Sequence, residues 1–244
     1  MSRRKIAGSL NQEKFRHRGH DILRIEALSD AVFAFSVSFL VASLEVPQTF
    51  EELKIIVKGA IPFFATVALL FLFWYRQYIF FRRYGLNDFT TTLLNLAYLA
   101  VILFYVYPLK FLFSLLISSW TGLDLFPKSS EQGLTVLAYE DFPLLIILFS
   151  TGYFVIWLLF YYMHKRALQF SAKLEFNQYE LLFTMKEKRG ALWNSLVGLM
   201  AVILSRAGLN WLAGTCYLLI PILLTINHRL FKHQVKNTLR IRFS

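Results

Sequence analysis

The feature that most constrains the fold of this chain is a series of uncharged apolar stretches. The clearest cover residues 142–163 and 207–227. A helix needs about 20 such residues to cross the hydrocarbon core of a bilayer. A soluble domain of 244 residues would not contain several of them, and 57% of the chain is hydrophobic against 17% charged. The sequence therefore predicts an all-α membrane protein.

Six transmembrane helices are expected, within one domain at residues 21–230. The domain lies between a basic N-terminal segment, 1–20, and a basic tail, 231–244. Pro47 ends the first helix, and the Asn87-Asp88 pair is a plausible cap for the third. The expected helices cover about 21–46, 55–81, 88–118, 143–166, 190–205 and 209–230.

The distribution of positive charge predicts the orientation. The net charge is +11, and 21 of the 26 Lys and Arg residues lie in four regions: residues 1–24, 76–83, 165–189 and 229–244. Cytoplasmic loops carry an excess of Lys and Arg. Both termini are therefore expected in the cytoplasm of a multi-pass protein of the cell membrane. Orientation explains the basicity without a nucleic-acid partner.

Few residues suit catalysis or metal binding. The single cysteine, Cys216, allows neither an intrachain disulfide nor a cysteine metal cluster. All five histidines fall in segments expected to be cytoplasmic: His17, His20, His164, His228 and His233. An intramembrane metal site or catalytic centre would therefore lack its histidine ligands or base. We expect no enzyme activity, no metal site and no cofactor.

The first expected helix is unusual because its uncharged part is short. Residues 31–44 would span about 21 Å, against a hydrocarbon core of about 30 Å. Either the helix fails to span the core, or Asp30, with or without Glu45, lies at membrane depth, where a charged side chain must face protein or water. We therefore expect an interior helix, enclosed by the later helices. The alternative is a short, tilted peripheral helix.

Asp30 needs partners from other helices, because Arg24 lies about 120° away on its own helix. The candidate partners at suitable depth are Trp74, Arg76 and Gln77 on the second helix and Asn95 on the third. The alternative is an interfacial, solvated Asp30.

Two stripes of the first helix are candidates for function. Ser29, Ser36 and Ser43 recur every seven residues, a spacing typical of close helix packing. The second stripe leads toward Glu45 and could equally be ordinary core; it consists of Phe35, Ser38, Phe39 and Ala42.

Residues 24–34 resemble a known signature. They read Arg-Ile-Glu-Ala-Leu-Ser-Asp-Ala-Val-Phe-Ala, similar to the Arg-x-x-x-Phe-Ser-Asp motif of the transmembrane protein 175 potassium channels. Trp74, Asn95 and Pro108 fall where such sequences have similar residues. Leu28 replaces the signature Phe, and Gln77 with Tyr78 stands where the family often has a His pair.

The resemblance implies a homotetramer of six-helix chains, with four copies of the first helix around a central pore. Phe35 would form a hydrophobic constriction, with Phe39 and Ala42 further outward and Ser38 as a polar layer. Smaller aliphatic residues are usual at the constriction. Arg24, Ser29 and Asp30 would hold the helix in place.

The resemblance also implies a function. The chain would form a modestly K⁺-selective leak channel without a carbonyl selectivity filter, and Glu45 would lie near the outer mouth of the pore. Permeant K⁺ would be the only bound ion. The expected partners are membrane lipids and further copies of the same chain. A proton-coupled transporter that uses Asp30, or a non-transporting membrane scaffold, are the alternative classes.

Overall fold

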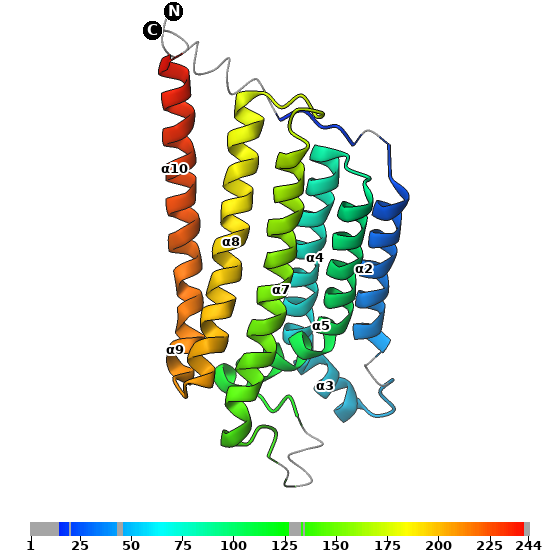
Figure 1. Cartoon of the computed structure of the whole chain (residues 1–244). Coiled ribbons are helices and arrows are strands. Elements are labelled where there is room, and N and C mark those ends of the chain that lie inside the picture. Colours follow the sequence, from blue (N-terminus) through cyan, green and yellow to red (C-terminus); the bar gives the residue numbers. More distant parts are fainter. Residues whose placement is uncertain (1–14, 20, 43–45, 127–132, 134, 242–244) are drawn as a thin grey trace, which may run out of the picture.

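The computed structural model describes residues 15–19, 21–42, 46–126, 133 and 135–241, and these form a bundle of long helices (Figure 1). α8 lies between α7 and α10, α7 contacts α5, and α5 contacts both α4 and α2. The helices are α2 (Arg24–Ala42), α3 (Phe50–Lys58), α4 (Ala60–Tyr84), α5 (Phe89–Thr121), α7 (Phe142–Gln169), α8 (Gln178–Arg206), α9 (Asn210–Thr215) and α10 (Leu219–Ile241), with 3₁₀ turns at Tyr139–Asp141 and Cys216–Leu218.

In the described part of the chain, five helical stretches are long and apolar enough to cross a membrane. They are Arg24–Ala42, Ala60–Tyr84, Phe89–Thr121, Tyr139–Gln169 and Asn210–Thr238. α8 is as long as its neighbours but does not meet this criterion. The expected fifth helix, residues 190–205, is continuous with a charged N-terminal half that carries Glu180, Lys186 and Glu187. The all-helical membrane fold is confirmed.

Two expected helices are interrupted, and a proline accounts for each break. The second expected helix, 55–81, is divided at Gly59 into α3 and α4, because Pro62 has no N–H to donate to the carbonyl of Lys58. Likewise, the sixth expected helix begins as α9 and continues as α10 after a 3₁₀ turn, and Pro221 follows that turn. α10 extends to Ile241, so the expected tail from residue 231 is helical as far as that residue.

Helix α2 lies at the edge of the single chain (Figure 1), packed against α4 and α5. The expectation that the chain's own later helices enclose it is wrong. Two neighbours bury only one stripe of a helix, and here that stripe includes Ser29, Phe33, Ser36 and Leu40. Ser43 and Glu45 lie outside the described residues.

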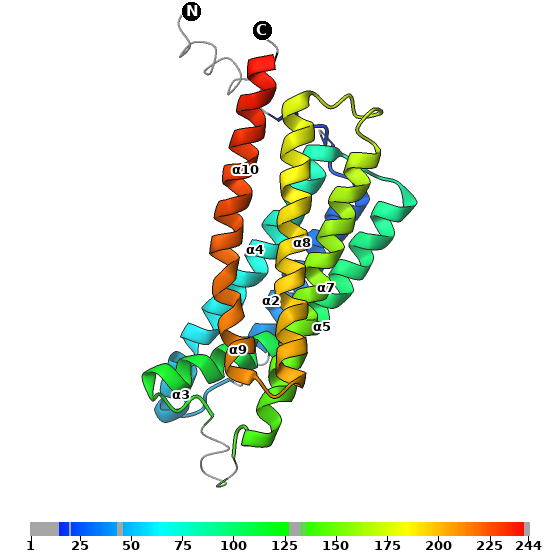
Figure 2. The same ribbon diagram turned by 60° about the vertical axis from the view of Figure 1, so that its left-hand side comes forward.

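Close packing joins α7 to α8 (Figure 2). Gly198 of α8 makes this possible, because a Cβ at that position would lie 3.0 Å from the backbone nitrogen of Phe154. Small residues let membrane helices approach in this way.

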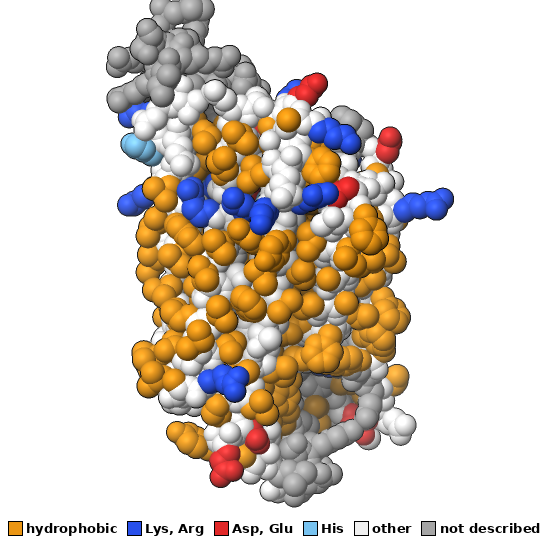
Figure 3. Space-filling model, viewed as in Figure 1, with side chains coloured by type: hydrophobic (Ala, Val, Ile, Leu, Met, Phe, Trp, Pro, Cys, Tyr) orange, Lys and Arg blue, Asp and Glu red, His pale blue; other side chains and the backbone are white. Residues whose placement is uncertain are grey.

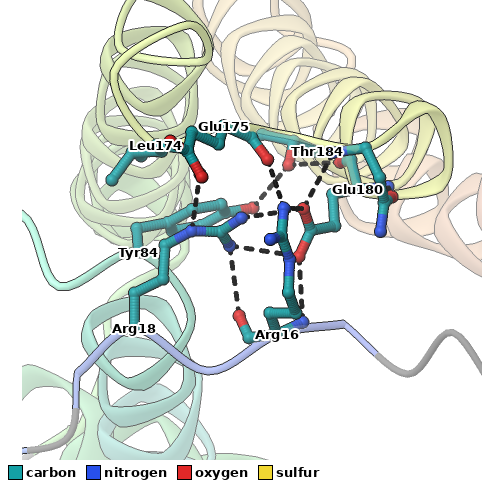
Figure 4. A network of polar contacts seen from close by, with 8 residues as sticks. Arg16, Arg18, Tyr84, Leu174, Glu175, Glu180 and Thr184 are labelled. Atoms are coloured by element: carbon teal, nitrogen blue, oxygen red, sulfur yellow. Dashed lines mark hydrogen bonds and ion pairs between the residues drawn. The ribbon is translucent and has the colours of Figure 1, made fainter.

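The charged end of the bundle is held together by Glu180 (Figure 4). Its buried carboxylate accepts hydrogen bonds from Arg18 at 2.8 Å and from Arg16 at 3.3 Å. With Asn177 it also forms the capping box that begins α8. Burial raises the pKa of Glu180, but the hydrogen bonds from Arg18, Asn177 and Arg16 outweigh it and lower the pKa to about 2. The segment before α2 is thereby anchored to α8.

Lys and Arg side chains form a row along one level of the molecule, above a broad apolar band (Figure 3). This end contains the beginning of α8 and the end of α10 (Figure 1). The arrangement is typical of a membrane protein with an apolar belt and a basic interface.

Candidate functional site

A buried cluster of three polar side chains joins α2, α4 and α5. Gln77 donates from Nε2 to Ser29 Oγ at 2.5 Å and to Asn95 Oδ1 at 2.9 Å, and Asn95 Nδ2 donates to Ser29 Oγ at 3.0 Å. The three side chains are at most 2% exposed. We call Ser29, Gln77 and Asn95 the polar anchor.

The polar anchor fixes the rotation of α2 about its own axis. A buried polar group without a partner costs free energy, so the partners must face one another. Turning α2 by one residue would move Ser29 by about 100° and break both contacts. The anchor therefore determines which side chains of α2 face away from the chain.

Asp30 has a different partner, next to the polar anchor. Trp74 Nε1 donates to Asp30 Oδ1 at 2.7 Å, and the Trp74 ring stacks on Tyr78 with centroids 5.6 Å apart. Asp30 is exposed in the single chain, as are Arg24 and Leu28 of the signature. Of the four expected partners of Asp30, Gln77 and Asn95 bond Ser29 instead.

Arg76 also points elsewhere. Its Nη1 lies 3.4 Å from Glu187 of α8, and its guanidinium is 5.4 Å from the ring of Trp157. Residue depth alone placed Arg76 near Asp30. However, Arg76 precedes Gln77 by one residue and therefore points about 100° away from it.

The second stripe of α2 lies on the other side of the helix from the polar anchor. We call these residues the Phe–Ser stripe: Phe35, Ser38, Phe39 and Ala42. Ser29 and Ser38 are nine residues apart, which is about 180° of helical rotation. Phe35 is 53% exposed, Ser38 and Ala42 are exposed, and Phe39 is partly buried. The rings of Phe35 and Phe39 are 4.2 Å apart between centroids, and Ser38 Oγ donates to the carbonyl of Ala34 at 3.0 Å.

A cavity of about 340 Å³ lies beside the charged end of α2. Its lining includes Glu26, Asp30 and Gln77, together with Tyr78 and Arg82 of α4. Glu26 is 7% exposed, and its Oε1 has no hydrogen-bond partner in the described structure. Glu26 and Asp30 are four residues apart on α2, and this spacing was the sequence signal that both side chains lie on one face.

Two further carboxylates were missed as organising residues. Glu180 was signalled by the Asn177-x-x-Glu180 spacing of a capping box. Glu187 had no comparable signal, because its partner Arg76 lies 111 residues away along the chain. Among the described residues, no group of three or more His, Cys, Asp and Glu side chains could hold a metal ion.

The apolar bundle and its anchored first helix define a polytopic α-helical membrane protein. Comparison with known proteins gives the family. Residues 24–105 match the family described as endosomal/lysosomal potassium channel TMEM175. A potassium channel of Marivirga tractuosa is 38% identical over 191 residues, which is 78% of this chain and 77% of the relative. The chain belongs to the TMEM175 potassium channel family, as the signature at residues 24–34 predicted.

Solved structures agree with this assignment. A variant of the potassium channel MtTMEM175, crystallised with a nanobody–MBP fusion protein, superimposes with a TM-score of 0.80 at 35% identity over 91% of this chain and 98% of that one. A lysosomal potassium-selective channel TMEM175 homolog from Chamaesiphon minutus shares the fold, with a TM-score of 0.51 at 19% identity over 84% of this chain and 96% of the homolog. These relatives are channels and not enzymes.

Proposed function

We propose that this chain is the subunit of a K⁺-permeable leak channel, a homotetramer with four α2 helices around a central pore. The observation that carries the proposal is the Phe–Ser stripe of α2, exposed in the single chain and opposite the polar anchor. An exposed face of this kind at the edge of the bundle is suited to cover by further copies. The potassium channels to which the chain is similar support the choice of ion.

The stripe suits a hydrophobic constriction. Large apolar side chains can close a pore by excluding water, and a layer of hydroxyl groups can replace part of the hydration shell of a cation. Phe35 would form the constriction and Ser38 the polar layer. Phe39 and Ala42 would lie further outward, with Glu45 near the outer mouth. Selectivity from such a device is expected to be modest.

Membrane topology is part of the proposal. Residues 190–205 of α8 would form the fifth crossing, beside α7, and would bring the number of crossings to six. The row of Lys and Arg side chains (Figure 3) would face the cytoplasm, because cytoplasmic segments are the basic ones. Arg24, Leu28, Ser29 and Asp30 would hold α2 in position and would not contact the ion.

Flux through proteoliposomes tests the constriction. Replacing Phe35 by Ala should raise passive K⁺ flux at least about tenfold, because a smaller side chain opens and wets the narrowest layer. Phe71→Ala on α4 is the matched control, since Phe71 is 54% exposed but lies outside the stripe. Equal flux in Phe35→Ala and wild type would remove Phe35 from the constriction.

The same assay separates the other classes of function. A proton-coupled transporter would show saturable flux that depends on a pH gradient and is lost in Asp30→Asn. A non-transporting scaffold would pass no ions, either as the wild type or as Asp30→Asn. Passive, non-saturating K⁺ flux in the absence of a pH gradient is the result that we expect.

A further inference from the structure

A second cavity lies away from α2, where side chains of α4, α7 and α8 face one another. It has a volume of about 410 Å³, within the range of about 300–1,000 Å³ that is usual for ligand sites. Three basic side chains line it: Arg76 and Arg83 of α4 and Lys186 of α8. Among the residues that the structure describes, Glu187 supplies the only lining carboxylate, so positive charge is in excess.

Glu187 pairs with two of the three basic side chains. It lies 3.4 Å from Arg76 Nη1 and 3.2 Å from Lys186 Nζ, so one carboxylate is shared between two positive charges. Arg83 instead lies over the ring of Phe183, 4.5 Å from its centroid, and it contacts no carboxylate within the described ranges. Arg83 therefore retains donors for an anion.

Trp157 also lines the cavity and is 8% exposed. Its ring lies 5.4 Å from the guanidinium of Arg76, a cation–π contact that helps to position this basic side chain. The cavity thus sets three positive charges against one lining carboxylate among the described residues, a balance that favours an anionic ligand with acceptor oxygens.

The remaining lining is apolar. Leu72 and Ile79 extend the α4 wall, and Ala191 extends the α8 wall. Leu72 lies one turn of α4 beyond Arg76, toward the apolar band of the molecule. A ligand with a charged head and a hydrocarbon tail matches this division between polar and apolar walls.

A smaller cavity of about 200 Å³ shares Arg76, Lys186 and Glu187 with the first and continues toward α10. Asn227 and His228 of α10 line it. Polar side chains of α10 therefore border the same basic residues of α4 and α8.

We propose that this α4–α7–α8 cavity binds a phosphate-bearing anion, with Arg76, Arg83 and Lys186 as the charged contacts. Basic pockets between membrane helices on the cytoplasmic side suit the headgroups of anionic lipids. The same phosphate chemistry is present in a free anion, so the test must distinguish the two sources. The inference does not depend on the proposed channel function, because binding is measured without flux.

The test measures binding of fluorescent short-chain phosphatidylglycerol to detergent-purified full-length protein by anisotropy. Arg83→Gln should weaken binding about fivefold, the effect expected for one basic residue. Arg83 is chosen because the described part of the chain gives it no ion pair that the variant would break. Glu187→Gln should strengthen binding, because it removes the opposing charge. Lys165→Gln is the matched control, since Lys165 is exposed on α7 and does not line the cavity.

Glycerol phosphate and phosphatidylcholine complete the design. If glycerol phosphate displaces the labelled lipid with the same order of variants, the phosphate group alone suffices. If only the lipid binds, the membrane is the source. Both results support the site. Equal phosphatidylglycerol binding by wild type, Arg83→Gln and Glu187→Gln, or equal affinity for phosphatidylcholine, overturns it.

Discussion

Ser29 and Ser36 share the buried face of α2, and neither side chain is exposed to solvent. Each hydroxyl donates to a carbonyl four residues earlier, at 2.7 and 2.8 Å. Only Ser29 also accepts hydrogen bonds from two other helices. Comparing substitutions at the two serines therefore distinguishes the stability that comes from a small buried residue from the stability that comes from the polar anchor.

Ser29→Ala should destabilise the protein more than Ser36→Ala does. The substitution leaves the amide groups of Gln77 and Asn95 with an unsatisfied donor each, at a cost of about 1–3 kcal/mol per buried group. Thermal unfolding in detergent micelles measures the difference. Equal loss in the two variants would mean that the anchor contributes nothing beyond packing.

Glu180 predicts a pH dependence of stability. Its pKa is lowered from an ordinary value of 4.5 to about 2 in the folded chain. A carboxyl group whose pKa is lower in the folded than in the unfolded chain stabilises the fold at pH values above its unfolded pKa. The contribution of Glu180 to stability is therefore complete above pH 4.5 and declines as the pH falls toward 2. The melting temperature of the wild type should be higher than that of Glu180→Gln at pH 7, and the difference between the two should become smaller below pH 4.5.

The control for Glu180 is Glu51→Gln. The Glu51 side chain is 78% exposed and pairs only with Lys54 on its own helix. Exposed pairs of this kind contribute little to stability. A constant gap between wild type and Glu180→Gln from pH 7 to pH 3 would contradict the assignment.

At the scale of helices, the approach of α7 to α8 depends on Gly198. Gly198→Ala should destabilise the protein by about 1–3 kcal/mol, because the added methyl group meets backbone that cannot move aside. Gly214→Ala is the control, since a Cβ there meets nothing within 4 Å. Unfolding in micelles compares the two. A neutral Gly198→Ala would show that the two helices can separate without cost.

The sequence predicts where the helices lie along the chain, but it does not predict how each helix is rotated about its own axis and so which partner each side chain faces. Apolar length located the long helices, and the signature at residues 24–30 identified the family. Ser29 and Asp30 are neighbours in sequence but point about 100° apart, so depth alone could not assign Gln77 to one and Trp74 to the other. Likewise, the Arg76–Glu187 pair depends on tertiary packing. The break at Pro62 was readable, because proline lacks the N–H that a continuous helix needs.

At the scale of the whole molecule, one chain leaves α2 half covered. The polar anchor directs one face toward α4 and α5, and the stripe with Phe35 and Ala42 faces outward. An isolated chain in a bilayer would place Ser38 and Asp30 on a lipid-facing helix, which is unfavourable for the charged group. The proposed symmetric assembly around α2 would remove this cost, because each copy would then cover the same face of its neighbours.

Cross-linking tests this assembly directly. In a proteoliposome preparation with Cys216 replaced by Ala, Ala42→Cys should form disulfide-linked dimers under mild oxidation, because equivalent positions near a symmetry axis lie close together. Ala68→Cys, an exposed alanine on α4, is the matched control and should remain monomeric on a denaturing gel. Dimers from Ala68→Cys and none from Ala42→Cys would place α4, not α2, at the axis. In that arrangement Phe35 would face lipid, and its effect on flux should disappear with it.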